Sequence, residues 1–405
     1  MIRTVLKTAA LAGAGLSLLA APAGAQEGAF EDWRAGFERE LLNDGVPSSI
    51  VREMFEGVEP NPVVIERDRT QPEFVRPVWV YLEGAVSEAR IENGRAAQAE
   101  HDATLQAIEN RCGVSRHVLA AIWGLESAYG VIKGDYDVVA SLSTLAWEGR
   151  RRGFAESQLR AVADMLERGY ARREDLKGSW AGAMGHTQFI PATYMERAVD
   201  FDGDGRRNIW TDEADALASA ANLLDRAGWR TGEPTVYAVS LPDGFDFSAW
   251  RQNEDRPVAE WAGIGLVRAD GEPWAAADLN RVAELELPAG AGAPGFLTFS
   301  NFDVIKRYNN STAYALGVSY LAKAFEDAEP LPGGWPENDP PITRSQTREL
   351  QAALTAMGYD TRGVDGMVGP NTRRALRRFQ AEHGLEPDGY AGAQSYSAVM
   401  AAAGE

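Results

Sequence analysis

The carboxylate of Glu126 lies in a small or apolar stretch, VLAAIWGLESAYG, that ends at Gly130. Leu119, Ile122 and Trp123 come seven, four and three positions before it, and on an α-helix these positions share one face. We therefore expect this carboxylate on the side of a helix that packs toward the interior. Burial raises the pKa of a carboxyl group, and a general acid for glycosidic cleavage must keep its proton near neutral pH. The alternative is a glutamate at a helix end that reaches solvent or caps a neighbour.

A second group of carboxylates, those of Asp200, Asp202 and Asp204, alternates with other residues and is followed by Gly205. This pattern is typical of the opening of a calcium loop, in which side chains at positions 1, 3 and 5 surround the ion and a glycine permits the sharp turn. Arg206 would contribute its backbone carbonyl. The standard loop closes with a glutamate at position 12, but this sequence has a threonine there. A turn rich in aspartate and glycine without a metal is the alternative.

The cysteine content and the net charge exclude or disfavour several other functions. Cys112 is the only cysteine, so an intramolecular disulfide is excluded, and we expect a small buried apolar residue rather than a nucleophile. The formal net charge is −19, which argues against binding to a nucleic-acid backbone, because that requires basic surface.

The elements that must position these groups are mainly helical. Apolar residues recur at helical spacing in three segments, the first of which is interrupted near Gly113. Two short strand patterns lie in a region rich in glycine and proline between about 230 and 300. We expect a mostly helical body that carries an insert with a little sheet. The expected helical segments are Gln98–Ser127, Glu156–Gly169 and Asn301–Ala328, and the expected strands are Tyr237–Leu241 and Ala283–Leu287.

The first 25 residues are typical of a signal peptide for export. Arg3 and Lys7 form a short basic start, Thr8–Ala21 is small and apolar, and the AGA of Ala23–Ala25 resembles a cleavage site. A membrane anchor would need about 20 apolar residues, more than this stretch has, and no second hydrophobic stretch follows. We expect an exported protein without a membrane span.

A boundary follows at Pro330–Pro341, which reads PLPGGWPENDPP. Five prolines in twelve residues exclude a helix or a central strand and are typical of a stiff linker. The 60 or so residues behind it suffice for a small domain. We expect a signal peptide at 1–25, a catalytic region at 26–329 with an insert at about 196–300, the linker at 330–341 and a further domain at 342–405.

Four blocks occur in order along the chain: IWGLESAYG (122–130), SWAGAMGHTQFIPATY (179–194), DFDGDGRRNIWTDEADA (200–216) and NFDVIKRYNNSTAY (301–314). Together they resemble the lytic murein transglycosylase B family, glycoside hydrolase family 103. The resemblance covers about residues 30–328. It implies a mainly α protein with an α+β lysozyme-like catalytic domain, and a periplasmic enzyme.

The resemblance also implies a reaction with one catalytic glutamate, matched by Glu126. That residue would protonate the glycosidic oxygen between N-acetylmuramic acid and N-acetylglucosamine. It would then act as base on the muramoyl C6 hydroxyl, which attacks its own C1 to give a 1,6-anhydromuramoyl end, and this chemistry requires no cofactor. Ordinary glycosidases need two carboxylates. Asp135, Asp137 and Glu148 could supply a second one, or they could be polar loop residues.

The matched blocks imply residues that contact the glycan strand. Ser179 and Gln188 offer hydrogen-bonding groups beside a turn of small residues. Tyr308, Asn309 and Tyr314 offer stacking faces and an amide, with half-buried core as the alternative for the tyrosines.

Two further assignments rest on the resemblance. Arg151 and Arg152 match arginines that would meet the anionic stem peptide or lactyl groups, unless they form a solvated basic run. In the acidic loop, the family closes its metal site with an acid just after a tryptophan-containing segment. Asp215 is the best match, one residue later than expected, with Asp212 and Glu213 as alternatives. A bound Ca²⁺ would then be structural.

Behind the linker, TRELQAALTAMG (347–358), VDGMVGPNTRRALRRFQ (364–380) and GLEPDG (384–389) resemble the small three-helix peptidoglycan-binding domain of many wall hydrolases. A tethered binding module raises the local concentration of an enzyme on a polymer. A packing domain without affinity for the wall is the alternative.

Three functions are compatible with these features. The favoured one is a lytic transglycosylase that acts on the glycan strands of peptidoglycan. The second is a hydrolytic muramidase, in which water attacks in place of the C6 hydroxyl. The third is a non-catalytic scaffold that binds the wall, against which the complete set of matched blocks argues.

Overall fold

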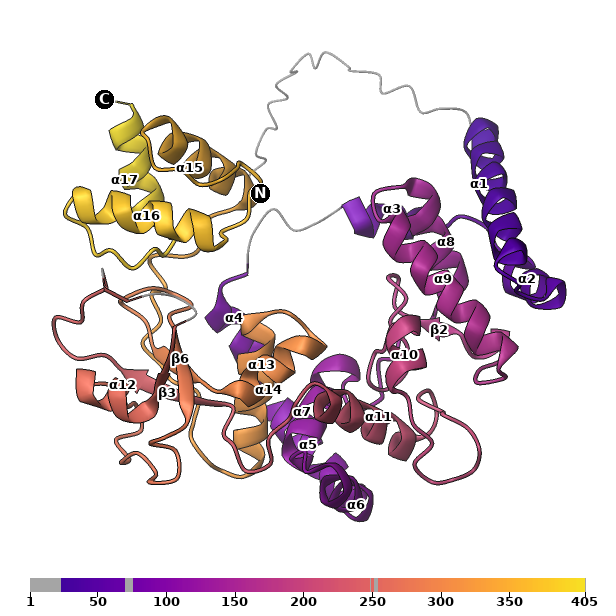
Figure 1. The fold of residues 1–405 in the computed structure, drawn as a ribbon, viewed down its shortest axis with the longest axis horizontal. Helices are drawn as coiled ribbons and strands as arrows, with labels where there is room; N and C mark the ends of the chain where they lie inside the picture. Colours follow the sequence, from indigo (N-terminus) through magenta and orange to yellow (C-terminus); the bar gives the residue numbers. More distant parts are fainter. Residues whose placement is uncertain (1–22, 70–75, 248, 251–253, 405) are drawn as a thin grey trace, which may run out of the picture.

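The computed structural model describes residues 23–69, 76–247, 249–250 and 254–404, which form two helical lobes, a small sheet and a C-terminal helical domain (Figure 1). The expected signal segment lies outside the described residues, except for its last three, which begin the first helix. Among the helices of the described part, none combines the length and the apolar character needed to cross a bilayer.

The first lobe is built around α7 (Arg116–Ser127) and α14 (Thr312–Phe325), which pack against each other. Its core joins side chains from distant parts of the chain, among them Leu119, Leu217 and Leu316, which are fully buried. The other helices of this lobe are α4 (Val78–Ala85), α5 (Glu88–Glu100), α6 (Asp102–Cys112), α11 (Glu213–Arg226) and α13 (Ser300–Tyr308).

The second lobe is built around the pair α8 (Val138–Glu148) and α9 (Arg152–Glu167). Leu142 and Leu159 lie in its own core, while Tyr308 packs against the cores of both lobes and so marks where they meet. The other elements are α1 (Ala23–Asn43), α2 (Ser48–Phe55), α3 (Pro62–Arg69), α10 (Pro191–Arg197), the 3-10 helix Arg173–Asp175, and β1 (Tyr136–Asp137) paired antiparallel with β2 (Lys177–Gly178).

The insert contains an antiparallel sheet of five strands in the order β4-β6-β7-β3-β5. Leu285 and Leu297 pair across its centre, and Trp261 of α12 (Val258–Ile264) packs into the same core. The two strands expected from sequence are present one residue earlier than expected. The strands are β3 (Val236–Ser240), β4 (Asp255–Pro257), β5 (Val267–Arg268), β6 (Val282–Glu286) and β7 (Gly295–Thr298).

Two of the expected helical segments are divided further than their periodicity indicated. The break near Gly113 is present, with that residue at a left-handed φ of 71°, but a second boundary at His101 separates α5 from α6. The segment after the sheet is broken before α14, because the Ser311 side chain accepts the Tyr314 N–H over 3.3 Å and so caps a new helix. Cys112 is half-buried rather than fully buried.

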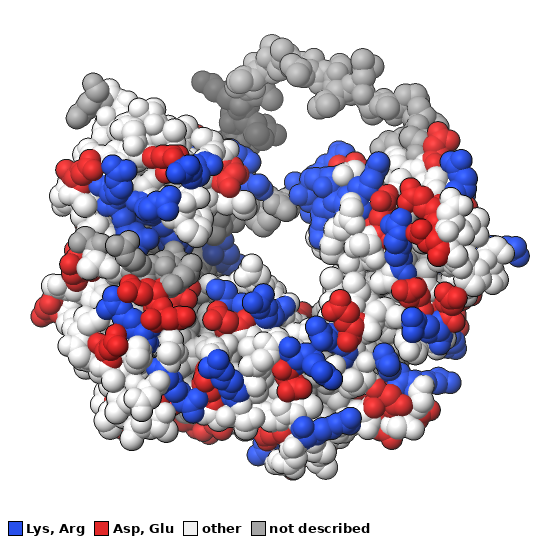
Figure 2. Space-filling view, in the orientation of Figure 1, with Lys and Arg blue, Asp and Glu red and all other residues white. Residues whose placement is uncertain are grey.

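The C-terminal domain consists of three helices, α15 (Arg344–Ala356), α16 (Pro370–Glu382) and α17 (Ala393–Ala403). A capping box between Thr343 and Gln346 begins α15. Leu350, Leu376 and Phe379 are buried at its centre. Figure 2 shows charges of both signs over this domain, as over the lobes.

The proline-rich segment before this domain forms no regular helix or strand, and it is packed rather than extended away from the body. Trp335 stacks on Trp79 of α4 and on Phe296 of β7, at centroid distances of 6.0 and 6.1 Å. The C-terminal domain also touches the loop after β6, where Asp388 accepts the Ala291 N–H over 2.9 Å. The linker therefore holds the two parts together. The mainly helical class with a β-containing insert and a three-helix domain is confirmed.

Candidate active site

Glu126 lies in the last turn of α7, at the edge of the first lobe. The Ser115 side chain caps the start of this helix by accepting the His117 N–H. Leu119, Ile122 and Trp123 are buried, so the face that carries Glu126 does pack into the core. The glutamate itself is half-buried, because it lies where that face ends.

Tyr314 of α14 contacts this carboxylate directly. Its hydroxyl donates a hydrogen bond to Glu126 Oε1 over 2.7 Å. Burial raises the pKa of Glu126 to about 7, even though the bond from Tyr314 favours the ionised form and lowers it. A carboxyl group with this pKa is present in both protonation states near neutral pH, as acid and base chemistry by one residue requires.

Two more tyrosines lie near the same carboxylate. Burial, together with the charge of Glu126, raises the pKa of Tyr308 well above its usual value, and does the same for Tyr81 to a smaller extent. Both phenols are therefore neutral hydrogen-bond donors. Tyr308 donates to the Thr187 carbonyl. Sequence reasoning missed Tyr81, because it lies in α4, outside the four blocks.

The chain leaves α7 in a strained conformation. Ala128 and Tyr129 have left-handed φ values of 49° and 60°, which cost non-glycine residues free energy. Ala128, rather than Gly130, is the residue that ends the helix. The strain is held in place by two contacts: Tyr129 donates from its hydroxyl to the Arg90 carbonyl over 2.7 Å, and the Ser127 hydroxyl accepts the Gly130 N–H over 3.0 Å.

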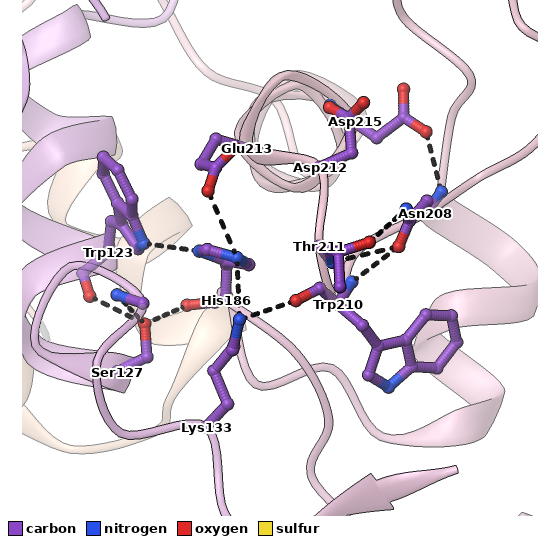
Figure 3. A network of polar contacts seen from close by, with 11 residues as sticks. Trp123, Ser127, Lys133, His186, Asn208, Trp210, Thr211, Asp212, Glu213 and Asp215 are labelled. Atoms are coloured by element: carbon purple, nitrogen blue, oxygen red, sulfur yellow. Dashed lines mark hydrogen bonds and ion pairs between the residues drawn. The ribbon is translucent and has the colours of Figure 1, made fainter. Parts of the chain in front are cut away.

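A buried polar network holds the same helix end to the rest of the site (Figure 3). Trp123 Nε1 donates to His186 Nδ1 over 3.1 Å, and the Ser127 hydroxyl donates to the His186 carbonyl over 2.6 Å. Burial and the charge of Lys133 lower the pKa of His186 to about 4, so the ring is neutral. Its Nε2 lies 3.7 Å from the Glu213 carboxylate.

Lys133 joins this network to the acidic loop. Its ammonium group lies 3.2 Å from His186 Nε2 and donates to the Trp210 carbonyl over 2.7 Å. His186 lies within the second sequence block, but the sequence indicated no role for it. Lys133 lies outside the four blocks and was not predicted as a site residue. The contacts to Trp123 span 63 positions, so no local pattern could have indicated them.

The turn of small residues expected to meet the sugar is held by its own side chains. The Ser179 hydroxyl accepts the Ala181 and Ala183 N–H groups. The amide of Gln188, a residue with a left-handed φ of 50°, donates to the Lys133 and Gly185 carbonyls over 3.0 and 2.9 Å. Both side chains therefore shape the loop, and sugar contacts by them stay predictions.

Other expected substrate residues are placed differently. Asn309 is exposed at the end of α13. Arg151 and Arg152 begin α9, in the second lobe, where Arg151 stacks over the Phe154 ring and lies 3.8 Å from Asp68. Arg152 donates to the Ala146 carbonyl over 3.1 Å. Among the described contacts of these arginines, none reaches α7 or α14.

The three carboxylates considered as a second catalytic group either bond to other residues or are exposed. Asp137 caps α8 and lies 2.7 Å from Arg173. Glu148 lies 3.0 Å from Arg69, and Asp135 is exposed.

The acidic loop brings its carboxylates together. One oxygen atom from each of Asp200, Asp202 and Asp204 lies within 4.8 Å of the others, and Asp202 forms a second such group with Asp212 and Asp215. All donors are hard oxygen atoms, which suit Ca²⁺. The residues present therefore fit this ion.

Asp215 also organises the loop from inside. It is only 1% exposed, and its two oxygens accept the Phe201 and Asn208 N–H groups over 2.6 and 2.7 Å. Burial raises its pKa, and the neighbouring carboxylates of Asp212 and Asp202 raise it further. Arg206 donates its N–H to Asp204.

Comparison with known proteins identifies the family of each part of the chain. Residues 29–323 match the family described as "Transglycosylase SLT domain". The chain belongs to that family. Residues 343–399 match the putative peptidoglycan binding domain. The family and the C-terminal domain predicted from the sequence blocks are thereby confirmed.

Individual relatives are similar over long stretches. The chain is 30% identical to membrane-bound lytic murein transglycosylase B of Escherichia coli over 253 residues, which are 61% of this chain and 67% of that protein. It superposes with a TM-score of 0.89 on SltB3 from Pseudomonas aeruginosa in complex with NAG-anhNAM-pentapeptide, at 45% identity over 92% of this chain and 99% of that one. Escherichia coli Slt35 in complex with calcium has a TM-score of 0.62 at 26% identity, over 72% of this chain and 92% of that one.

Proposed function

We propose that this chain is a lytic transglycosylase that cleaves the β-1,4 bond between N-acetylmuramic acid and N-acetylglucosamine in peptidoglycan, and that Glu126 is its acid and base. The observation that carries the proposal is a single half-buried carboxyl group with a pKa of about 7 that is bonded to a tyrosine. Membership of the transglycosylase family and a match to a peptidoglycan-binding domain support the substrate class.

The chemistry needs two proton transfers at one carboxyl group. Protonated Glu126 gives its proton to the glycosidic oxygen as the bond to muramoyl C1 breaks, which leaves a carboxylate stabilised by the Tyr314 hydroxyl. That carboxylate then accepts the proton of the muramoyl C6 hydroxyl as its oxygen bonds to C1. The products are a 1,6-anhydromuramoyl end and a free N-acetylglucosamine end, and Glu126 regains its proton.

Product analysis tests this mechanism against hydrolysis. Purified sacculi digested with the enzyme should release muropeptides with anhydromuramoyl ends, which are lighter than reducing ends by one water in mass spectra. Reducing muramoyl ends as the main product would overturn the transglycosylase assignment in favour of a hydrolytic muramidase.

A matched pair of variants tests the single carboxylate. Glu126→Gln should lose at least 1,000-fold in rate, in line with the loss of an acid and base that act in both steps. Glu148→Gln, at a carboxylate paired with Arg69, should keep the wild-type rate. Equal activity of Glu126→Gln and wild type would exclude Glu126 as the catalytic group and revive a scaffold role for the protein.

We further propose that the acidic loop holds a structural Ca²⁺ through Asp200, Asp202 and Asp204, with Asp212 or Asp215 closing the site. The ion would supply fixed charge that pins the loop, and the reaction requires no step at it. The structure of the related Slt35 with calcium supports the choice of ion.

Export and wall binding complete the proposal. The basic and apolar start of the chain supports secretion to the periplasm, where peptidoglycan is accessible. The C-terminal domain would hold the enzyme on the wall. Cell fractionation with a tagged chain would find it in the periplasmic fraction, and a cytoplasmic location of the processed enzyme would contradict the localisation.

A further inference from the structure

A pocket of about 300 Å³ lies where the C-terminal domain meets the catalytic region. The catalytic side is lined by the end of β6, the loop behind it and the first turn of α14, and the other side by α16 and the loop before α17. Its volume is at the lower end of those of small-molecule sites. It is therefore suited to one end of a peptide rather than to a glycan strand.

Glu286, the last residue of β6, is 8% exposed and lines this pocket. In the described part of the chain its carboxylate has no hydrogen bond and no ion pair within 4.0 Å. Burial raises its pKa, while the more distant charges of Lys306 and Arg373 lower it. A buried carboxylate without a partner is costly, so a cationic or donor group is expected to meet it.

Arg373 of α16 lines the same pocket. This residue is half-buried. Burial lowers the pKa of its guanidinium, and the charges of Glu286 and Asp388 oppose this effect. Among the described residues, none forms a hydrogen bond or an ion pair with that side chain. Two opposite charges thus line one pocket without closing on each other, which leaves room for a molecule that carries both charges.

The cationic side of the pocket has further support. Arg76 lines it, as do Thr312 and Ala313 in the first turn of the 14-residue helix α14. The N–H groups of a helix start have no partner within the helix and attract anions. Guanidinium groups bind carboxylates through charge-assisted hydrogen bonds. Apolar side chains such as Ile342 and Val368 cover the remaining wall.

We propose that this pocket binds an amino acid or peptide end that carries both a free carboxylate and a free ammonium group, the carboxylate at Arg373 and Arg76 and the ammonium at Glu286. Peptidoglycan stem peptides have both groups, and this choice of ligand rests on the proposed function. The first turn of α14 also contains Tyr314, which bonds to Glu126. One wall of the pocket and the tyrosine that contacts the proposed catalytic carboxyl group are therefore on the same helix, while Glu126 itself lies on α7.

Chemical blocking of the ligand tests the proposal without changing the protein. The probe is the N-acetylated pentapeptide L-Ala-γ-D-Glu-meso-diaminopimelate-D-Ala-D-Ala, titrated into the full chain by calorimetry. Acetylation of the free amine and amidation of the free carboxyl group at the end of its diaminopimelate side chain should each weaken binding about 10-fold or more, because each removes a charge-assisted hydrogen bond. Equal affinities of all three forms would overturn the proposal.

Variants then locate the contact. Glu286→Gln should weaken binding of the free-amine peptide about 10-fold but leave binding of the acetylated peptide unaffected. Arg373→Gln should weaken binding of the peptide with the free carboxyl group about 10-fold but leave binding of the amidated peptide unaffected. Arg374→Gln is the matched control, since this neighbour is exposed and bonds to Asn371. If the variants weaken every form of the peptide alike, Glu286 and Arg373 only hold the domains together and the proposal fails.

The test is independent of catalysis. Binding is measured again with Glu126→Gln, which should bind the pentapeptide as wild type does. Full digestion of sacculi by Glu126→Gln would refute the catalytic assignment and leave the binding result standing. Loss of the differential effects in the variants would refute the pocket and leave the catalytic assignment standing.

Discussion

The Tyr314 hydroxyl bonds to Glu126 Oε1 over 2.7 Å, across 188 positions of sequence. This bond joins the two central helices of the first lobe at the point where the proposed chemistry takes place. It also opposes the effect of burial on the pKa of the carboxyl group, so Tyr314 makes Glu126 a stronger acid than burial alone would.

Tyr314→Phe should raise the pKa of Glu126 further above 7, because the bond that stabilises the carboxylate is lost. Activity requires protonated Glu126, so it falls as pH rises through this pKa. In the variant, that alkaline limb should move to higher pH while the maximal rate falls about 10-fold. Rates on sacculi between pH 5 and 9 measure both effects.

Tyr320→Phe provides the matched control, since that hydroxyl lies on the same helix and bonds to Glu329 over 3.0 Å. It should lower stability by about 1 kcal/mol without moving the pH profile. An unchanged alkaline limb in Tyr314→Phe would show that the profile reports a different group.

Glu126→Gln should stabilise the protein at alkaline pH. The folded-state pKa of about 7 lies above the ordinary value of 4.5, so the folded wild type binds more protons between these values and loses stability as pH rises through that range. The glutamine variant lacks this loss. It should gain about 2 kcal/mol at pH 8, after allowance for partial exposure, and little at pH 4. Thermal unfolding at both values checks this, with the exposed Glu196→Gln as control.

His186→Asn should remove an acid-sensitive element. The folded-state pKa of about 4 lies below the ordinary 6.5, so the unfolded chain binds the extra proton and wild-type stability falls as pH drops from 6.5 to 4. Between pH 6.5 and 4, the free energy of unfolding of the variant should fall by about 2 kcal/mol less than that of the wild type. Its kcat should drop while KM stays, because Trp123 and Ser127 position the end of α7 through this residue.

His383→Asn, in the C-terminal domain, is the control for this histidine, since its ring contacts Phe379. It should leave kcat unchanged. A change in KM alone on replacing His186 would indicate a substrate contact instead of a positioning role.

Removal of Ca²⁺ should destabilise the protein without abolishing the chemistry. At a free concentration 100 times Kd, a bound ion contributes about 2.7 kcal/mol, so a chelator should lower Tm by several degrees. Asp202→Asn should make Tm insensitive to the chelator, because Asp202 belongs to both carboxylate groups of the loop. The exposed Asp243→Asn should respond as wild type does, and an identical Tm with and without chelator in wild type would exclude the metal site.

The sequence by itself indicated the candidate side chains for the proposed chemistry and which segments are helical. The spacing of Leu119, Ile122 and Trp123 placed Glu126 on an inward face, because helical periodicity is a local property. The alternate carboxylates at Asp200, Asp202 and Asp204 are local as well, and they converge in the structure. The four blocks indicated the family that the comparisons confirm.

Tertiary structure decided what each of these groups meets. Tyr81 and Tyr314 surround Glu126 because α4 and α14 pack against each other and α14 packs against α7, and no periodicity within one segment reports contacts between segments. The buried network of His186 likewise depends on contacts between distant segments. So does the packing of Trp335, which lies in a segment that the sequence predicts only as a linker. Whether a polar side chain such as Gln188 faces the ligand or its own loop depends on hydrogen-bond partners that are in place only after folding.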